Sequence, residues 1–270
     1  MTKINDNKRI ESESKAEEYL MKATELPYVR VPRQEFLISV LKNKDLDDIK
    51  KFIKTGDVNI FSREYLDTLA KKIIKEETYR TSTISFATGM PGGYAATATI
   101  PTDILQNLAH SLRLVQKLLY IYGVGDLYDE NGKLQEKGKN ILIAYFGVML
   151  GVNSATTAVG LFSKNAPNEI AKKIKYLKVN ETVWYPIIKS VLKYFGFKVT
   201  KKGMTEFVKK AVPIVGGFVS GGITYVGMNK SGERLRHRLS EISFDYTEEK
   251  AKSDFEKYEK IVKEYREEEL

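Results

Sequence analysis

The stretch ILIAYFGVMLGVNSATTAVGLFS, residues 141–163, contains no charged side chain and decides how this chain must fold. Two further stretches share this property, Thr81–Thr102 and Ala211–Asn229. Each is about long enough to cross a bilayer as a helix, for which roughly 20 residues suffice. Each also carries two glycines four residues apart, a spacing that allows close approach of another helix. These segments must therefore pack against something apolar, either the protein core or a membrane.

Prolines and polar residues inside these stretches favour the core. Pro91 and Pro101 lie in the first stretch, and a helix interior tolerates proline poorly. Asn153 lies in the middle of the second, and Pro213 opens the third. We therefore expect central helices of a bundle, hydrophobic on all sides. Reversible membrane insertion is the alternative, for which residues 141–163 are the best candidate.

Helical periodicity extends through most of the remaining sequence. Apolar residues recur at helical spacing from Gln34 to Lys54, with a break near residues 43–45 and a turn at Gly56. Ser62 opens another amphipathic helix, and Asp103–Tyr122 predicts a helix that ends at Gly123. Only the short block at residues 26–31 is strand-like.

The C-terminal segment has the narrow apolar seam of a long helix. Ala251, Phe255, Tyr258, Val262 and Tyr265 alternate at spacings of four and three, which predicts packing on the body of the protein. The sequence thus predicts an all-α fold, a single helical bundle with glycine-rich central apolar helices and a long charged C-terminal helix. We expect a charged leader (1–25), a helical domain (26–240) and an acidic helix (241–270).

Composition places the chain among folded proteins and suggests a compartment. Its 270 residues are 42% hydrophobic and 29% charged, with a mean hydropathy of -0.33. The chain has no cysteine, so disulfides and thiolate metal sites are excluded. The first residues are polar, without the apolar region of a secretory signal. We expect a cytoplasmic protein, peripheral to the inner membrane.

The net charge of +9 is unevenly distributed. Residues 164–210 hold twelve lysines against three acids, whereas residues 241–270 hold eleven acids against six bases. The basic window indicates either a solvated lysine face or a surface for anionic headgroups or nucleic acid. The candidate anionic-surface residues are Lys172, Lys173, Lys175, Lys201, Lys202, Lys230, Arg234 and Arg238.

Lys230, Arg234 and Arg238 have two equally good interpretations. They lie four residues apart on one helical face and directly follow the third uncharged stretch. A membrane anchor is expected at such a position. The same residues are equally suited to pairing with the acidic C-terminal segment.

One polar stripe is a candidate for chemistry. Asp103, Asn107 and His110 fall at positions i, i+4 and i+7 of an otherwise apolar helix. In a catalytic interpretation Asp103 orients His110, which acts as the base of a hydrolase. A helix cap combined with a buried polar network is the favoured interpretation, because Pro101 and Asp103 suit the first turn of a helix.

Metal and cofactor sites are not expected. The chain has two histidines, and no HExxH or comparable ligand spacing. The glycine-rich segment GMPGG (89–93) lacks the Lys-Ser/Thr and the preceding strand of a phosphate-binding loop.

Two longer segments carry a family resemblance. They are GMPGGYAATATIPTDILQNLAHSLRLVQKLLYIYG (89–123) and KAVPIVGGFVSGGITYVGMNKSGERLRHRL (210–239). The glycine-rich turn before Pro-x-Asp, the helix closing in Tyr-Gly and the late Val-Pro-x-x-Gly-Gly block resemble the bacterial EcsC family. The positions highlighted are Gly92, Gly93, Pro101, Asp103, Tyr122, Gly123, Pro213, Gly216 and Gly217.

The resemblance implies a helical protein that some bacteria encode beside an ABC exporter, without an agreed biochemical activity. It covers roughly the central two-thirds of the chain and supplies no catalytic residues. Its glycines and prolines indicate backbone geometry more readily than chemistry.

The leading functional prediction is a non-enzymatic protein at the cytoplasmic membrane face, an accessory or membrane-perturbing factor. Its expected partner is an anionic membrane surface or a membrane protein, and a homo-oligomer is compatible with the glycine faces. A hydrolase using Asp103 and His110 is the second hypothesis. A basic nucleic-acid-binding protein ranks last, because no docking motif is present.

Overall fold

The computed structural model describes residues 20, 22–24, 26–83, 102–176, 187, 190–191 and 221–268. Within these ranges the chain forms helices joined by turns, with a single isolated antiparallel bridge between Tyr128 and Leu134. The predicted all-α fold class is confirmed. The predicted charged leader lies almost entirely outside the described residues.

The N-terminal part consists of short helices that lead into one long helix. They are η1 (Pro27–Val29), α2 (Arg33–Leu41), α3 (Leu46–Thr55), η2 (Val58–Ile60) and α4 (Arg63–Thr83). The Asp45 carboxylate begins α3 by accepting hydrogen bonds from two backbone N–H groups of its first turn. Gly56 ends α3 in the left-handed conformation of a C-cap. Both breaks were predicted, whereas the predicted strand at residues 26–31 is wrong, because Pro27 opens a 3-10 turn there.

The C-terminal part contains the longer helices. They are α5 (Thr102–Ile121), α6 (Glu136–Leu150), α7 (Asn153–Leu161), α8 (Asn168–Tyr176), α11 (Gly221–Phe244) and α12 (Glu248–Glu268). The boundaries of α5 match the predicted helix, and Gly123 follows it with a φ of 76°. These boundaries confirm that the apolar period placed this helix correctly.

The uncharged stretch 141–163 is two helices, not one. α6 ends at Leu150, and the C-cap Gly151, with a φ of 84°, turns the chain. The N–H of Gly151 donates to the carbonyls of Gly147 and Val148. α7 starts two residues later and packs against α6. The interpretation of this stretch as a single spanning segment is therefore wrong, since the glycine ends the helix. None of the helices in the described ranges is both long and apolar enough to cross a membrane.

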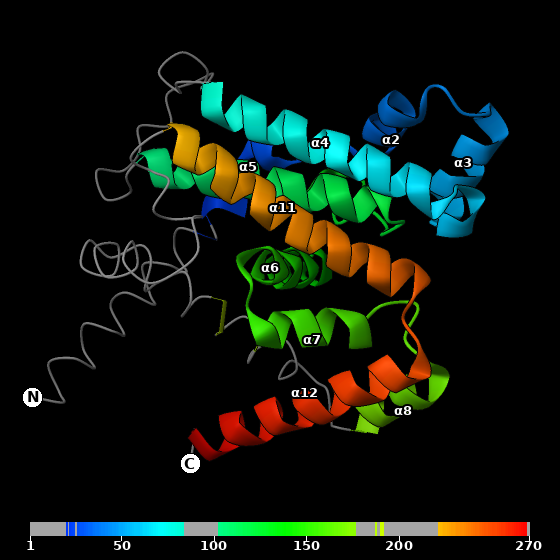
Figure 1. Ribbon diagram of the computed structural model, residues 1–270, viewed down its shortest axis with the longest axis vertical. Coiled ribbons are helices and arrows are strands. Elements are labelled where there is room, and N and C mark those ends of the chain that lie inside the picture. Colours follow the sequence, from blue (N-terminus) through cyan, green and yellow to red (C-terminus); the bar gives the residue numbers. More distant parts are fainter. Residues whose placement is uncertain are drawn as a thin grey trace, which may run out of the picture.

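The helices form layers, which Figure 1 shows from top to bottom. α4 packs on α11 and α5, and α6 lies beneath α11 and α5. α7 follows under α6, and α12 with α8 closes the bottom of the stack. The helix pair from the uncharged stretch thus lies between charged outer helices.

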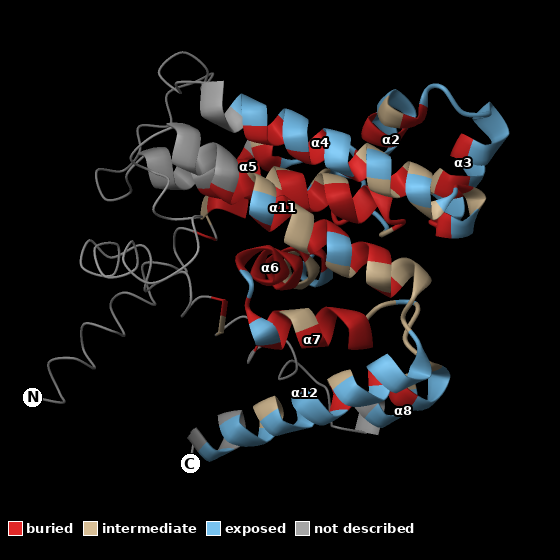
Figure 2. Ribbon diagram, viewed as in Figure 1, coloured by how far each residue is buried: buried red, intermediate tan, exposed pale blue. Residues whose placement is uncertain are grey.

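Burial follows this layering (Figure 2). Every residue from Leu142 to Leu150 of α6 is buried, whereas α12 exposes most of its length. α12 buries Ala251, Phe255 and Tyr258, so the predicted seam is confirmed over these positions. The predicted packing of the C-terminal helix on the body is also confirmed.

Candidate functional site

The predicted polar stripe lies on α5, close to α4. Asp103 and Asn107 belong to this helix with His110, but their side chains lie outside the described residues. His110 is only 8% exposed. The catalytic interpretation of the stripe stays a prediction, and a base at this position is largely shielded from solvent.

His110 sits beside a buried ion pair. Glu77 of α4 is 2% exposed and pairs with Lys117 of α5. Burial lowers the pKa of His110; the Glu77 charge raises it, and the charges of Arg113, Lys117 and Arg80 lower it. The net result is a pKa of His110 below its ordinary value, so the buried imidazole is neutral at neutral pH.

Acidification is therefore expected to destabilise the protein through His110. The unfolded chain binds this proton at a higher pH than the folded chain. The contribution of His110 to stability is complete above the ordinary histidine pKa of about 6.5 and is lost as pH falls through the folded value. Urea denaturation between pH 8 and pH 5 should show a smaller loss in His110→Gln than in the wild type. Equal losses would exclude His110 as the source.

Of the positions from the family resemblance, Asp103 lies in the first turn of α5, and the side-chain or backbone contacts of two others, Tyr122 and Gly123, serve the packing of helices. The Tyr122 hydroxyl donates to Asp67 of α4 at 2.5 Å. A Cβ added at Gly123 would overlap the carbonyl oxygen of Gly56, so the two backbones are in close contact. The other positions with that resemblance, Gly92, Gly93, Pro101, Pro213, Gly216 and Gly217, lie outside the described residues.

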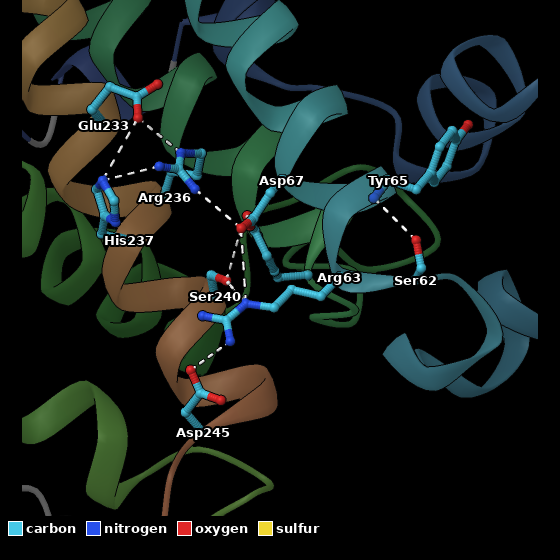
Figure 3. Close-up of polar contacts among 10 residues, drawn as sticks. Ser62, Arg63, Tyr65, Asp67, Glu233, Arg236, His237, Ser240 and Asp245 are labelled. Atoms are coloured by element: carbon cyan, nitrogen blue, oxygen red, sulfur yellow. Dashed lines mark hydrogen bonds and ion pairs between the residues drawn. The ribbon is translucent and has the colours of Figure 1, made fainter.

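Asp67 also belongs to a polar network that joins α4 to α11 (Figure 3). Arg236 is buried and pairs with Glu233 at 2.8 Å and with Asp67 at 3.3 Å. Ser240 donates to the same carboxylate, and Arg63 pairs with Asp245 at 2.7 Å. Each arginine has a carboxylate partner, and Ser240 is 2% exposed, so the network holds two helices together rather than presenting a nucleophile.

The predicted anionic surface is only partly a surface. Arg234 donates to the carbonyl of Met149 at the end of α6. Arg238 pairs with Glu241 and, on α12, with Asp254, and its side chain is 10% exposed. Its assignment to a lipid-facing surface is therefore wrong. The alternative, pairing with the acidic C-terminal segment, is confirmed for this residue.

The remaining predicted lysines divide into two groups. Lys172, Lys173 and Lys230 are exposed on α8 and α11. The side chain of Lys175 and all of Lys201 and Lys202 lie outside the described residues.

A basic surface that the sequence analysis missed lies on α4. From Lys71 to Arg80 every exposed position holds Lys, Arg, Glu or Tyr. We call this surface the α4 basic face; its members are Lys71, Lys72, Lys75, Glu76, Tyr79 and Arg80. Its single acid is exposed and lies 3.9 Å from Lys72. The sequence contains a signal for this surface: the lysines recur at helical spacing, and the apolar residues between them mark the opposite, buried face of the same helix.

Tyr79 is the aromatic member of this face. Tyr79 is 63% exposed, one of the few large hydrophobic side chains open to solvent among the described residues. Gly232 of α11 packs against Ile74 of α4, so the two helices are in close contact along the stretch that carries this face. The described part of α4 thus presents an excess of positive charge beside an amphipathic aromatic ring.

No family model, no curated sequence and no solved structure matched this chain. The EcsC resemblance therefore stays a prediction. No group of three His, Asp or Glu side chains suited to hold a metal ion occurs within the described ranges.

Proposed function

We propose that the protein binds anionic membrane surfaces peripherally through the α4 basic face, as an accessory or membrane-perturbing factor at the cytoplasmic side. The observation that carries this proposal is the excess of cations among the exposed positions of α4 between Lys71 and Arg80. An anionic lipid surface attracts each nearby Lys or Arg by about 1 kcal/mol. Several such residues on one helix add up to useful, salt-sensitive binding.

Tyr79 suits the same role. Tyrosine is enriched at membrane–water interfaces, where its ring contacts the acyl boundary and its hydroxyl remains hydrated. Directly after Arg80 the sequence enters the uncharged stretch Thr81–Thr102. A peripheral membrane anchor is expected to combine basic residues with an adjacent apolar segment, and both are present here. The membrane-perturbing part of the proposal rests on this stretch, because residues 141–163, and Met228 of the third stretch, belong to the core.

Neutralising two lysines of the α4 basic face should weaken vesicle binding. In Lys71→Gln/Lys75→Gln we expect a loss of about 2 kcal/mol, roughly 30-fold in partition coefficient. Co-sedimentation with vesicles of phosphatidylcholine and phosphatidylglycerol, at low and at physiological salt, measures this change. Binding of the wild type should fall as salt rises.

A matched control comes from another helix. Lys51 and Lys54 are exposed on α3, and Lys51→Gln/Lys54→Gln makes the same change in net charge. This variant should bind like the wild type. Equal weakening of both variants would show that only net charge matters, and the α4 basic face would lose its role. Wild-type binding to pure phosphatidylcholine with the same affinity would also contradict the proposal.

A further inference from the structure

A groove lies between α7 and α12, at the end of the molecule opposite α4 (Figure 1). Its volume is about 670 Å³, within the range of roughly 300–1,000 Å³ that small-molecule sites occupy. One wall is the first turn of α7 and the other is one flank of α12, with the end of α11 between them. The residues that matter for its charge are Arg238, Glu241, Lys250, Asp254, Lys257 and Lys260.

Both carboxylates in the groove are already engaged by cations. Arg238 pairs with Glu241 at 2.8 Å and with Asp254 at 2.5 Å. Lys250 pairs with Glu241 at 3.0 Å. The lining of the groove contains four cationic side chains but only two carboxylates, so it carries an excess of positive charge.

Lys257 and Lys260 account for this excess of positive charge. No acid in the described part of the chain lies within ion-pair distance of either lysine. On the opposite flank of the same helix, Lys252 pairs with Glu248 at 2.7 Å and Lys263 with Glu267 at 4.0 Å. Lys257 and Lys260 therefore differ from Lys250, Lys252 and Lys263 of the same helix in having no carboxylate partner among the described residues.

The α7 wall adds polar groups to the same space. Asn153 is exposed at the start of α7 and lines the groove. Val152, the N-cap of α7, supplies no side-chain hydrogen bond to the N–H groups of the first turn. Ser253 of α12 contributes a hydroxyl to the lining. Hydrogen-bond donors and unpaired ammonium groups thus share one partly enclosed space.

We propose that this groove binds a soluble small molecule bearing a phosphate group. Lysine is a common ligand for phosphate, and two lysines three residues apart on one helix can contact a single dianion. The Arg238 fork is occupied by carboxylates, so recognition depends on these two lysines. The groove and the α4 basic face lie at opposite ends of the molecule (Figure 1), so a protein bound to a membrane through α4 keeps the groove open to solution.

Titration calorimetry of the full chain with glycerol 3-phosphate and with inorganic phosphate tests this proposal. The wild type should bind, and Lys257→Gln/Lys260→Gln should bind at least about tenfold more weakly, the typical effect of losing one charge-assisted hydrogen bond. Lys252→Gln/Lys263→Gln changes the same residue type on the opposite flank of α12. This control should bind within about twofold of the wild type.

Other outcomes overturn the proposal. Absence of heat with both phosphates, or equal weakening in the two double variants, excludes the groove as a phosphate site. Two measurements distinguish the phosphate site from the proposed membrane binding. Lys257→Gln/Lys260→Gln should co-sediment with vesicles like the wild type, and Lys71→Gln/Lys75→Gln should still bind glycerol 3-phosphate. Loss of vesicle binding in the groove variant would identify a lipid headgroup as the ligand and contradict a soluble one.

Discussion

Gly123→Ala is expected to destabilise the protein by about 3–5 kcal/mol, a loss typical of backbone strain combined with a buried steric clash. The φ of Gly123 is 76°, in the left-handed region that side chains disfavour. An added Cβ would also overlap the carbonyl oxygen of Gly56, which belongs to a backbone and cannot rotate away. The two segments would have to separate where α3 and α5 both end.

Urea denaturation measures this effect, and a nearby glycine provides the control. Gly125→Ala lies two residues away, where an added Cβ meets no atom within 4 Å. It should change the free energy of unfolding by less than about 0.5 kcal/mol. Gly56→Ala should match Gly123→Ala, and the double variant should lose less than the sum, because both changes separate the same contact. A small effect of Gly123→Ala would show that the two backbones are not in contact.

Arg238→Ala is expected to destabilise the protein by about 3–5 kcal/mol, because it leaves the carboxylate of Asp254, whose side chain is 13% exposed, without its cation. The guanidinium donates to Glu241, to Asp254 and to the carbonyl of Thr156, so it links α11, α12 and α7. Burial lowers the pKa of Arg238, but its hydrogen bonds with the two carboxylates outweigh this effect and raise it. The guanidinium of Arg238 is therefore charged throughout the accessible pH range.

A thermodynamic cycle isolates the bond between the two helices. Arg238→Ala, Asp254→Ala and the double variant are compared by urea denaturation. The double variant should be more stable than the sum of the single losses implies, since the second change removes an already unpaired charge. Lys252→Ala, at an exposed position of α12, is the control and should unfold like the wild type. Additive losses would show that Arg238 and Asp254 do not interact.

Much of the helical framework was predictable because its signals are local. Asp45 begins α3 with a side-chain cap, and Gly56 ends it with a left-handed turn. Both signals depend only on adjacent residues. The seam of α12 repeats within one helix, so periodicity alone identified Ala251, Phe255 and Tyr258 as its buried face.

Composition was less reliable than periodicity. The absence of charge from 141 to 163 indicated one apolar unit, although Gly151 divides it into α6 and α7. The glycine pair Gly147 and Gly151 suggested a helix face, yet the second glycine is a C-cap. A count of apolar residues does not distinguish a glycine that packs from one that ends a helix.

The candidate sites depended on contacts between distant segments. Arg238 could belong equally to a membrane anchor or to an internal pair until α12 was placed beside α11 and α7. The groove could not be predicted either, because its two free lysines become unusual only when their flank of α12 faces α7. The α4 basic face was within reach of the sequence, since Lys71, Lys75 and Tyr79 follow helical spacing.

The orientation of the protein on a membrane tests the central claim most directly. Because the chain has no cysteine, single cysteines can be introduced at exposed Thr68 of α4 and exposed Glu259 of α12 and labelled with a fluorophore. The measurement is fluorescence with anionic vesicles whose lipids carry a quencher in the headgroup region. Binding through the α4 basic face predicts strong quenching of the label at position 68 and little at position 259. Equal quenching at both positions, or quenching at position 259 alone, would contradict the account.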